Sequence, residues 1–376
     1  MPRTTRRISL GGVPVGAGAP VTVQSMTNTR TDDVAATMAQ IEELASAGCD
    51  LIRVAVPDRN SLAGLAELVR ESPIPVIADI HFDYRLAIAA IEAGAHAIRI
   101  NPGNLGGADR ATAVAKAAHA AAIPVRIGVN TGSLTGQQLA ACSGQRPEAM
   151  VAAAREYCTM FEEAGCHALK VSLKASDVAT TVTACRLFAA QTDYPLHLGV
   201  TEAGTPAAGL VKSAIGIGAL LLDGIGDTIR VSLTAPPIEE VKAGLRILEA
   251  VGLREAAPEI VSCPTCGRTR IALQPLVEAV EDEVRRLKAS GHTIQLRKIA
   301  LMGCVVNGPG EARDADLGIA GGDGKGVLFR HGEIVRTMPE SELLPAFLAE
   351  LHRHTSPAVE GTGKRTYIAS HSSNTK

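Results

Sequence analysis

One unit is repeated along most of the chain, from Val21 to Ala235. Each copy is a short run rich in β-branched residues that ends in polar residues, followed by an Ala- and Leu-rich stretch of helical length. Eight β/α units in about 230 residues predict an α/β fold, a (β/α)8 TIM barrel. The alternative is an open doubly wound sheet, which usually has fewer strands. The expected strand cores are Val21–Ser25, Leu51–Val56, Val76–Ile80, Ala97–Ile100, Val125–Val129, Ala168–Leu173, Leu196–Val200 and Thr228–Leu233.

A short segment before the repeat, Ile8–Val15, contains two β-rich runs separated by a Gly-Gly pair. This pattern predicts a β-hairpin. Because the hairpin precedes the first barrel strand, we expect it to close the N-terminal mouth of the barrel. Its expected role is structural.

Basic residues recur in the predicted strands, and TIM barrels have their active sites at the carboxyl ends of those strands. These residues alternate with apolar neighbours and therefore lie on a different face of each strand. Several cations with few acids nearby are hard to bury without an anion, and guanidinium and ammonium groups suit phosphate oxygens. The sequence predicts a small polyanionic substrate with two phosphates; internal ion pairs with Asp79 and Glu202 are the alternative. The basic residues are Arg53, Arg99, Arg126, Lys174 and Arg230.

Two lysines in the sixth strand, Lys170 and Lys174, leave another enzyme class open. A lysine in a barrel strand can form a Schiff base with a carbonyl substrate, as in aldolases. Nothing in the sequence indicates a lowered lysine pKa, and the arginines nearby indicate a phosphate equally well. A phosphosugar lyase or aldolase barrel with a zinc-binding appendage is therefore the second enzyme hypothesis.

Four potential metal ligands lie in the last third of the chain. Cys263 and Cys266 form a Cys-Pro-Thr-Cys pair, and Cys304 and Glu311 flank a segment that contains Asn307-Gly-Pro-Gly310. Three thiolates and one hard oxygen suit an iron–sulfur cluster with one exchangeable iron better than a closed structural zinc site. The glycines let the backbone approach a bulky inorganic core. A zinc site, a Cys263–Cys266 disulfide and unreactive thiols are the alternatives.

The other five cysteines lie apart from one another along the sequence, and we interpret them as small buried hydrophobic residues. A chain of this length does not need a disulfide scaffold, so a reducing cytoplasm is the expected compartment. These cysteines are Cys49, Cys142, Cys158, Cys166 and Cys185.

Charge and composition argue against two classes of partner. A net charge of −2 gives the chain no overall electrostatic attraction to nucleic acid or anionic lipid. An aromatic content of 2% without Trp leaves few side chains on which bases could stack. No apolar run approaches the roughly 18 to 20 residues that span a bilayer, and the basic N-terminus lacks the apolar segment of a secretory signal. We therefore expect neither a nucleic-acid partner nor a membrane association.

The β/α repeat stops near Pro258, and shorter elements follow. We predict a TIM-barrel substrate-binding domain over residues 1–257 and a small α+β iron–sulfur domain over residues 258–355. Residues 356–376 are rich in Ser, Gly and Thr, which is typical of a disordered tail. In the second domain we expect helices at 275–288 and 341–352 and strands at 293–301, 317–320, 327–330 and 334–338.

Long motifs between about Arg7 and His352 give the chain a specific resemblance. They are Val23-Gln-Ser-Met-Thr-Asn-Thr29, Ala78-Asp-Ile-His-Phe-Asp83, Ala97-Ile-Arg-Ile-Asn-Pro-Gly103, Arg126-Ile-Gly-Val-Asn130, Lys174-Ala-Ser-Asp177, His197-Leu-Gly-Val-Thr-Glu-Ala-Gly204, Cys263-Pro-Thr-Cys266 and Gly303-Cys-Val-Val-Asn-Gly-Pro-Gly-Glu311. In these motifs the chain closely resembles bacterial 4-hydroxy-3-methylbut-2-enyl diphosphate synthases, which act in the methylerythritol phosphate route to isoprenoids. The sequence shows no departure from that family at a ligand position.

This resemblance implies a [4Fe–4S] cluster, with Cys263, Cys266 and Cys304 on three irons. It implies that Glu311 binds the fourth iron in the resting state and leaves it when substrate binds. The implied reaction is reductive ring opening of 2-C-methyl-D-erythritol 2,4-cyclodiphosphate, with electrons from flavodoxin or ferredoxin. The resemblance also implies a head-to-tail homodimer in which the cluster of one chain completes the barrel site of the other. A non-enzymatic iron–sulfur carrier or redox sensor is the alternative outside the enzymes.

The resemblance and the strand-end positions together suggest roles for individual side chains. Glu202 is the expected proton donor to the departing hydroxyl, and His81 and His197 are alternative donors. Asn130 and Gln24 are expected to position the substrate. The residues expected to bind its diphosphate are Arg53, Arg99, Arg126, Lys174, Arg230 and Ser232.

Overall fold

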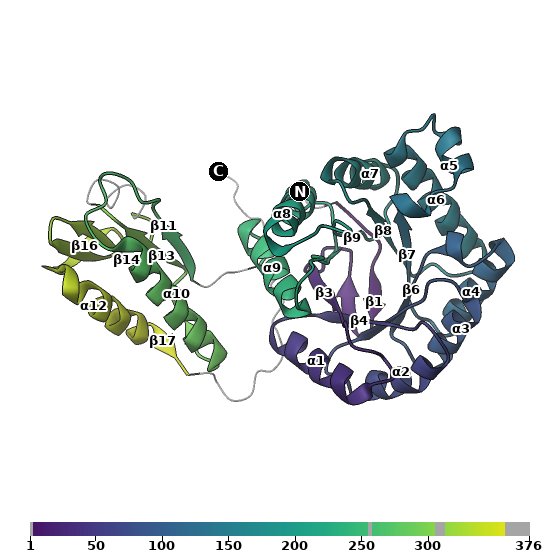
Figure 1. Cartoon of the computed structure of the whole chain (residues 1–376), viewed down its shortest axis with the longest axis horizontal. Coiled ribbons are helices and arrows are strands. Elements are labelled where there is room, and N and C mark those ends of the chain that lie inside the picture. Colours follow the sequence, from purple (N-terminus) through teal and green to yellow (C-terminus); the bar gives the residue numbers. More distant parts are fainter. Residues whose placement is uncertain (1–2, 255–257, 305–312, 358–376) are drawn as a thin grey trace. The chain divides into compact units, whose positions relative to one another are not determined.

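The computed structural model describes residues 3–254, 258–304 and 313–357 (Figure 1). The described residues fall into two compact units, one ending at Arg254 and one formed by the residues that follow. Each unit has its own hydrophobic core. Of the predicted disordered tail, residues 356–376, the part from 358 onwards lies outside the described residues, and the prediction is wrong for Ser356, which belongs to a short strand, Thr355–Ser356.

The first unit is a parallel barrel, as the repeat predicts, and the open doubly wound sheet is wrong. Its strands follow the order β8-β7-β6-β5-β4-β3-β10-β9, and a parallel bridge between Val171 and Leu196 joins the two ends. At this junction the Val171 amide donates to the Pro195 carbonyl over 2.9 Å. The strands are β3 (Thr22–Met26), β4 (Leu51–Ala55), β5 (Val76–Asp79), β6 (Ala97–Ile100), β7 (Val125–Asn130), β8 (Leu169–Lys174), β9 (His197–Leu198) and β10 (Thr228–Ile229).

Helices follow the strands and cover the outside of the barrel (Figure 1). Several begin at an aspartate that caps the first turn: Asp33, Asp83 and Asp177 each accept a hydrogen bond from a backbone N–H two or three residues later. Among the described residues, no helix is both long enough and apolar enough to cross a bilayer. The helices are α1 (Val34–Ser46), α2 (Asn60–Glu71), α3 (Tyr84–Glu92), α4 (Ala108–Ala120), α5 (Gly136–Ala141), α6 (Arg146–Glu163), α7 (Val178–Gln191), α8 (Pro206–Leu222) and α9 (Pro237–Ala250).

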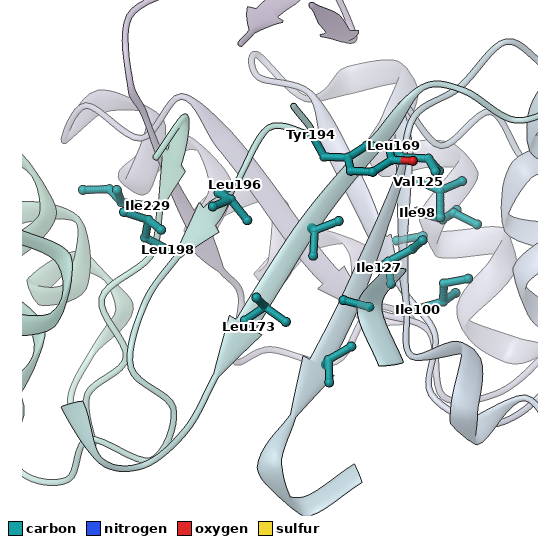
Figure 2. Close-up of a cluster of buried hydrophobic side chains, with 14 of the residues drawn as sticks. Ile98, Ile100, Val125, Ile127, Leu169, Leu173, Tyr194, Leu196, Leu198 and Ile229 are labelled. Atoms are coloured by element: carbon teal, nitrogen blue, oxygen red, sulfur yellow. The ribbon is translucent and has the colours of Figure 1, made fainter. Parts of the chain in front are cut away.

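The two faces of the barrel strands differ in polarity. Ile98, Ile100 and Ile127 point outwards into the apolar layer beneath the helices (Figure 2). Arg99 and Arg126 alternate with them and therefore face the interior. TIM-barrel interiors are usually filled with bulky apolar side chains, so a charged interior is a departure that needs an explanation.

The predicted hairpin is present as β1 (Ile8–Leu10) and β2 (Val13–Val15). Its side chains pack against Leu51, Ile77 and Ala97, which stand at the beginnings of three barrel strands. The hairpin therefore closes the N-terminal mouth. Only the carboxyl ends of the strands remain for an open site.

The second unit contains a five-stranded sheet in the order β11-β13-β14-β15-β16, covered by α10 (Leu273–Ala289) and α12 (Glu340–Arg353). The first three strands run parallel and the last two antiparallel. The strands are β11 (Glu259–Ser262), β13 (Lys298–Met302), β14 (Leu317–Gly322), β15 (Lys325–Arg330) and β16 (Glu333–Pro339).

One strand predicted in this unit is wrong in extent. The expected strand 293–301 is divided into β12 (Thr293–Ile294), which pairs with β17 (Thr355–Ser356), and β13. The two pieces join different sheets because the carboxylate of Asp316 accepts the N–H groups of Arg297 and Lys298, at 2.6 and 2.9 Å, where the chain enters β13. Strand β11 was not predicted.

Candidate active site

A cavity of about 310 Å³ opens at the carboxyl ends of the barrel strands. It contains four of the predicted site residues, His81, Arg99, Asn130 and Glu202, which come from four different strand ends. The remaining lining residues are small or polar and supply further hydrogen-bonding groups. They are Asn101, Asn104, Thr131, Gly132, Ser133, Ser176 and Thr201.

The predicted cations converge inside the barrel mouth with few acids among them. Arg53, Arg99 and Arg126 are 8%, 7% and 4% exposed, and their charges act on one another's pKa values. Asp79 neutralises part of this charge: its carboxylate lies 3.1 Å from Arg99 Nη1 and 3.7 Å from Arg53 Nε. Despite its burial, the pKa of Asp79 is lowered, because the charge of Arg53, the hydrogen bond from His81 and the charge of Arg99 outweigh desolvation.

Arg230 pairs with Glu240 of α9, at 3.3 Å between Nη2 and Oε2. Glu240 is only 5% exposed and also accepts the backbone N–H of Leu233 over 2.9 Å. The alternative prediction that Asp79 and Glu202 neutralise the arginines is therefore correct for Asp79 only. Among the described residues Glu202 has no ion pair, and Glu240 takes that place.

Two buried cations below the cavity lack polar partners. Arg126 Nε and Nη1 and Lys170 Nζ are buried without a hydrogen bond in the described structure, and Lys170 is 1% exposed. The two residues are paired in register on β7 and β8. Burial, followed by the charge of Arg126, holds the pKa of Lys170 well below its usual range, while Asp227 opposes this shift. Two uncompensated buried cations store electrostatic repulsion that an anion can relieve.

Glycines make room for two of the cations. A methyl group at Gly128 would lie 3.0 Å from Arg99 Nε, and one at Gly199 would lie 2.7 Å from Lys174 Nζ. Burial and then the charge of Arg126 hold the pKa of Lys174 well below its usual range. The inner wall is therefore shaped to accept long basic side chains.

The stability of the fold should depend on pH through Lys170. The unfolded chain protonates this lysine below pH 10.5, its ordinary pKa, whereas the folded chain disfavours the proton. The unfolded state thus binds more protons in that window, and the free energy of unfolding rises with pH by up to about 1.4 kcal/mol per unit. Urea unfolding from pH 7.5 to 10 should show this slope in the wild type and a smaller one in Lys170→Met. The exposed-site control Lys116→Met should keep the wild-type slope, and equal slopes in all three proteins would contradict this assignment.

The remaining predicted polar residues differ in their access to the cavity. His81 is half-exposed, and its Nε2 lies 3.3 Å from Asp79 and 3.2 Å from Arg99. His197 is fully buried, with Nδ1 2.8 Å from Thr228 Oγ1, and it does not line the cavity. Burial and nearby lysine and arginine charges lower its pKa, which makes it a poor proton donor. Gln24 is 1% exposed with both amide atoms unpartnered among the described residues.

Glu202 has an unusual backbone. Its φ angle is +51°, in the left-handed region that a non-glycine residue rarely adopts. The residue is exposed, lines the cavity and lies in the loop between β9 and α8. Strain of this kind is found at functional sites, where the surrounding structure fixes one side-chain direction.

The three predicted ligand cysteines stand on one edge of the second unit. Strands β11 and β13 are parallel neighbours, and Cys263 and Cys304 follow their carboxyl ends. The N–H of Gly303 donates to Cys263 Sγ over 3.2 Å, and a turn in which Cys266 and Thr269 exchange hydrogen bonds follows Cys263. The fourth predicted ligand, Glu311, and the segment Asn307–Gly310 lie outside the described residues.

The chemistry of these cysteines fits an iron–sulfur cluster. All three are free thiols, so the Cys263–Cys266 disulfide is wrong. The backbone amide and the charge of Arg268 lower the pKa of Cys266, which favours the thiolate that binds iron, and the Gly303 N–H supports the Cys263 sulfur in the same way. In the ranges 3–254, 258–304 and 313–357 no group of three or more Cys, His, Asp or Glu residues is arranged so that it could hold a metal ion.

The five remaining cysteines are not part of this edge. Cys49, Cys158, Cys166 and Cys185 are buried, as predicted, whereas Cys142 is partly exposed. Burial raises the pKa of Cys166 to about 11 and that of Cys185 to about 12, so these thiols are unreactive near neutral pH.

Two family models match the chain, and their boundaries follow the two units. The model described as the GcpE TIM-barrel domain matches residues 5–245, and the model described as the GcpE protein C-terminal domain matches residues 259–353. The chain belongs to the GcpE family. The resemblance deduced from the motifs is thereby confirmed.

Two similar bacterial proteins support the assignment to this family. Over 353 residues the chain is 51% identical to a Geobacter sulfurreducens protein named 4-hydroxy-3-methylbut-2-en-1-yl diphosphate synthase (flavodoxin), covering 94% of this chain and 98% of that protein. A Maridesulfovibrio salexigens protein of the same name is 50% identical over 350 residues, covering 93% and 96%. Among solved structures, a Yersinia pestis dihydropteroate synthase covers 66% of this chain and 100% of its own, with 13% identity and a TM-score of 0.48, too low to support an argument.

Several features of this GcpE chain were missed from the sequence. No role was predicted for Glu240 or Met26, although Glu240 pairs with Arg230 and Met26 contacts both Arg53 and Arg230. The space for the basic side chains could have been predicted from Gly128 and Gly199. Each stands two residues after a basic or polar inward residue of a predicted strand.

Proposed function

We propose that this chain catalyses the reductive ring opening of 2-C-methyl-D-erythritol 2,4-cyclodiphosphate to 4-hydroxy-3-methylbut-2-enyl diphosphate. The observation that carries the proposal is the excess of buried cations over carboxylates inside the barrel, where Arg99 lines a cavity of about 310 Å³ and the charges of Arg53 and Arg126 act on the same group of side chains. The names of relatives that are about half identical over almost the whole chain agree with this chemistry. A carbonyl substrate bound to Lys170 is disfavoured, because Lys170 is 1% exposed and lies four residues before the carboxyl end of β8.

The charge change of this reaction explains the composition of the site. The ring C–O bond to phosphate breaks, a hydroxyl leaves as water and a C=C bond forms, with two electrons and one proton consumed. The released phosphate oxygen gains a negative charge, so the diphosphate becomes more anionic as the ring opens. Preorganised guanidinium groups stabilise such developing charge at little reorganisation cost. We assign this role to Arg53, Arg99, Arg126, Lys174, Arg230 and Ser232, with Asn130 and Gln24 as positioning groups.

We assign the redox centre to Cys263, Cys266, Cys304 and Glu311, as ligands of a [4Fe–4S] cluster. When bound, the cluster would supply electrons and a Lewis-acidic iron whose carboxylate ligand is harder than a thiolate and exchanges more readily. The Gly303 N–H at the Cys263 sulfur supports a thiolate ligand, and the free thiols suit a reducing cytoplasm. A flavodoxin is the electron donor that the relatives' names indicate, and ferredoxin is the alternative.

Glu202 is the proposed proton donor to the departing hydroxyl. Its loop fixes the backbone in a strained conformation at the cavity, and no cation of the described structure pairs with its carboxyl group. His81 is the alternative donor. In steady-state assays Glu202→Gln should lower kcat by about 10² to 10⁴, the range typical of general acids, with little change in substrate affinity. Glu163→Gln, at the exposed end of α6, is the control; full turnover in Glu202→Gln would remove this residue from the role.

We further propose a head-to-tail homodimer that shares each active site between two chains. If the cluster of one chain serves the barrel of the other, inactive variants of opposite kind should complement each other. Mixing Cys304→Ser chains with Glu202→Ala chains should restore about a quarter to a half of the wild-type activity per dimer formed, because mixed dimers hold one intact site. Each variant alone, unfolded and refolded in the same way, is the control. Absence of any recovery in verified mixed dimers would contradict the shared site.

The function itself is tested on anaerobically purified protein. Iron and sulfide analysis should give about four irons per chain, which excludes a zinc site. Reduced flavodoxin should be oxidised only when the cyclic diphosphate is present, with two electrons per product molecule, which excludes a simple electron carrier. Iron-free protein that still converts the substrate would refute the proposal.

A further inference from the structure

Met26 makes contacts that its apolar chemistry does not predict. It is the last residue of β3, and its Sδ lies 3.2 Å from Arg53 Nε and 2.9 Å from Arg53 Nη2. Arg230 Nη1 lies 3.6 Å from the same sulfur. One thioether thus accepts hydrogen bonds from two guanidinium groups of the proposed substrate site.

The strand order produces this arrangement. Strand β3 lies between β4, which carries Arg53, and β10, which Arg230 follows directly. Met26 and Arg53 are partners in register on β3 and β4, so their side chains leave the sheet on the same face. Any long residue at position 26 would therefore pass between the two arginines.

The other partners of these arginines show what a neutral residue adds. Arg53 has Asp79 at 3.7 Å and Arg230 has Glu240 at 3.3 Å, so each guanidinium already has one carboxylate. A third carboxylate between them would neutralise the charge that an anionic ligand needs. A thioether is a weak acceptor and is polarisable, so it can orient N–H groups without cancelling their charge.

We propose that Met26 is a positioning residue that holds Arg53 and Arg230 in place for the two phosphates of the substrate. This inference rests on the proposed function, since it assumes a diphosphate between these arginines. Orienting the two guanidinium groups before binding lowers the entropy that the ligand must remove from them. A residue that only fills space would not have this effect on affinity.

The test is a binding measurement on the anaerobic holoenzyme without reductant, so that no turnover occurs. Isothermal titration with the cyclic diphosphate should show about five- to tenfold weaker binding to Met26→Leu than to the wild type, the loss typical of one modest hydrogen-bonding interaction. The control Met150→Leu changes a buried methionine of α6 outside the site and should bind as the wild type does. Met26→Gln, which keeps an unbranched side chain with an acceptor, should retain most of the affinity.

A double-mutant cycle separates orientation from packing. In an Arg53→Gln background Met26→Leu should cost clearly less affinity than in the wild type, because the group that the sulfur orients is gone. Equal losses in both backgrounds, or wild-type affinity in Met26→Leu, would overturn the inference. If Met26→Leu does not fold, Met26→Gln is measured alone against the wild type, and a five- to tenfold loss of affinity in Met26→Gln would overturn the inference. Failure of the wild type to bind the cyclic diphosphate would instead refute the proposed function.

Discussion

Replacing Cys304 with serine should abolish the cluster and the turnover together. A serine hydroxyl is a far weaker ligand for iron than a thiolate, and the two remaining thiols cannot complete a cubane. We expect kcat/KM to fall by more than about 10³-fold, since no other redox group is proposed for the reaction. The iron content and the visible absorption of the anaerobic protein should fall in parallel with activity.

The matched control is Cys142→Ser, a partly exposed cysteine of the barrel unit. It should keep the full iron content and activity, because it lies in a separate unit from the ligand edge. The barrel offers a second readout: Cys304→Ser should still bind the cyclic diphosphate, because all the proposed phosphate contacts lie in the barrel unit. A Cys304→Ser protein with full iron and full activity would remove this cysteine from the ligand set.

Replacing Arg126 with methionine should have two large effects of opposite sign. Arg126 is 4% exposed, and two of its nitrogens have no partner among the described residues. Burial, followed by the charges of Arg53 and Arg99, lowers the pKa of Arg126, which shows that its charge is disfavoured in the free protein. We expect the free energy of unfolding of the variant to be about 1 to 4 kcal/mol higher than that of the wild type, as happens when an apolar residue of similar size replaces a buried charge.

The same substitution should remove one of the main phosphate contacts. Losing a buried guanidinium that pairs with an anion costs about 2 to 5 kcal/mol, so kcat/KM should fall by about 30- to 4,000-fold. Urea unfolding and steady-state kinetics on the same preparation measure both effects. Arg246→Met, on the exposed face of α9, should change neither. A variant that loses stability and keeps its activity would show that Arg126 is structural.

The two opposite effects expected of Arg126→Met mean that this residue lowers the stability of the free protein and supports its function. The proposed diphosphate would neutralise cations that repel one another in the free protein, which would explain why these cations are retained. Ligand binding should therefore stabilise the fold strongly. It should also weaken the pH dependence that Lys170 confers.

The sequence predicted the barrel because its signals are local. Each strand was marked by a β-branched run, and most predicted boundaries agree with the structure within one or two residues. The last two strands were predicted too long, because the ladder keeps only His197–Leu198 and Thr228–Ile229. The missed strand β11 is short and half-exposed at the edge of its sheet, so it has no clear alternation to detect.

The convergence of the arginines could be predicted, but their partners could not. Alternation along each strand placed Arg53, Arg99 and Arg126 on the inner face. Glu240 lies in a helix, and Met26 reaches both Arg53 and Arg230 only because β3 is paired between β4 and β10, so these contacts depend on the order of the strands in the barrel. For the cluster, spacing placed Cys263 near Cys266, while only the pairing of β11 with β13 brings Cys304 to the same edge.

The close contacts at Gly199 restrict which substitutions the barrel interior of this enzyme can accept. A methyl group there would lie 2.5 Å from the Arg230 carbonyl oxygen and 2.7 Å from the Lys174 ammonium, so even alanine would force two parts of the wall apart. No substitution at position 199 can enlarge the barrel interior for a bulkier ligand, because glycine already has no side chain. A larger interior would require the loss of one of the basic side chains, and this loss would weaken the binding of the anion.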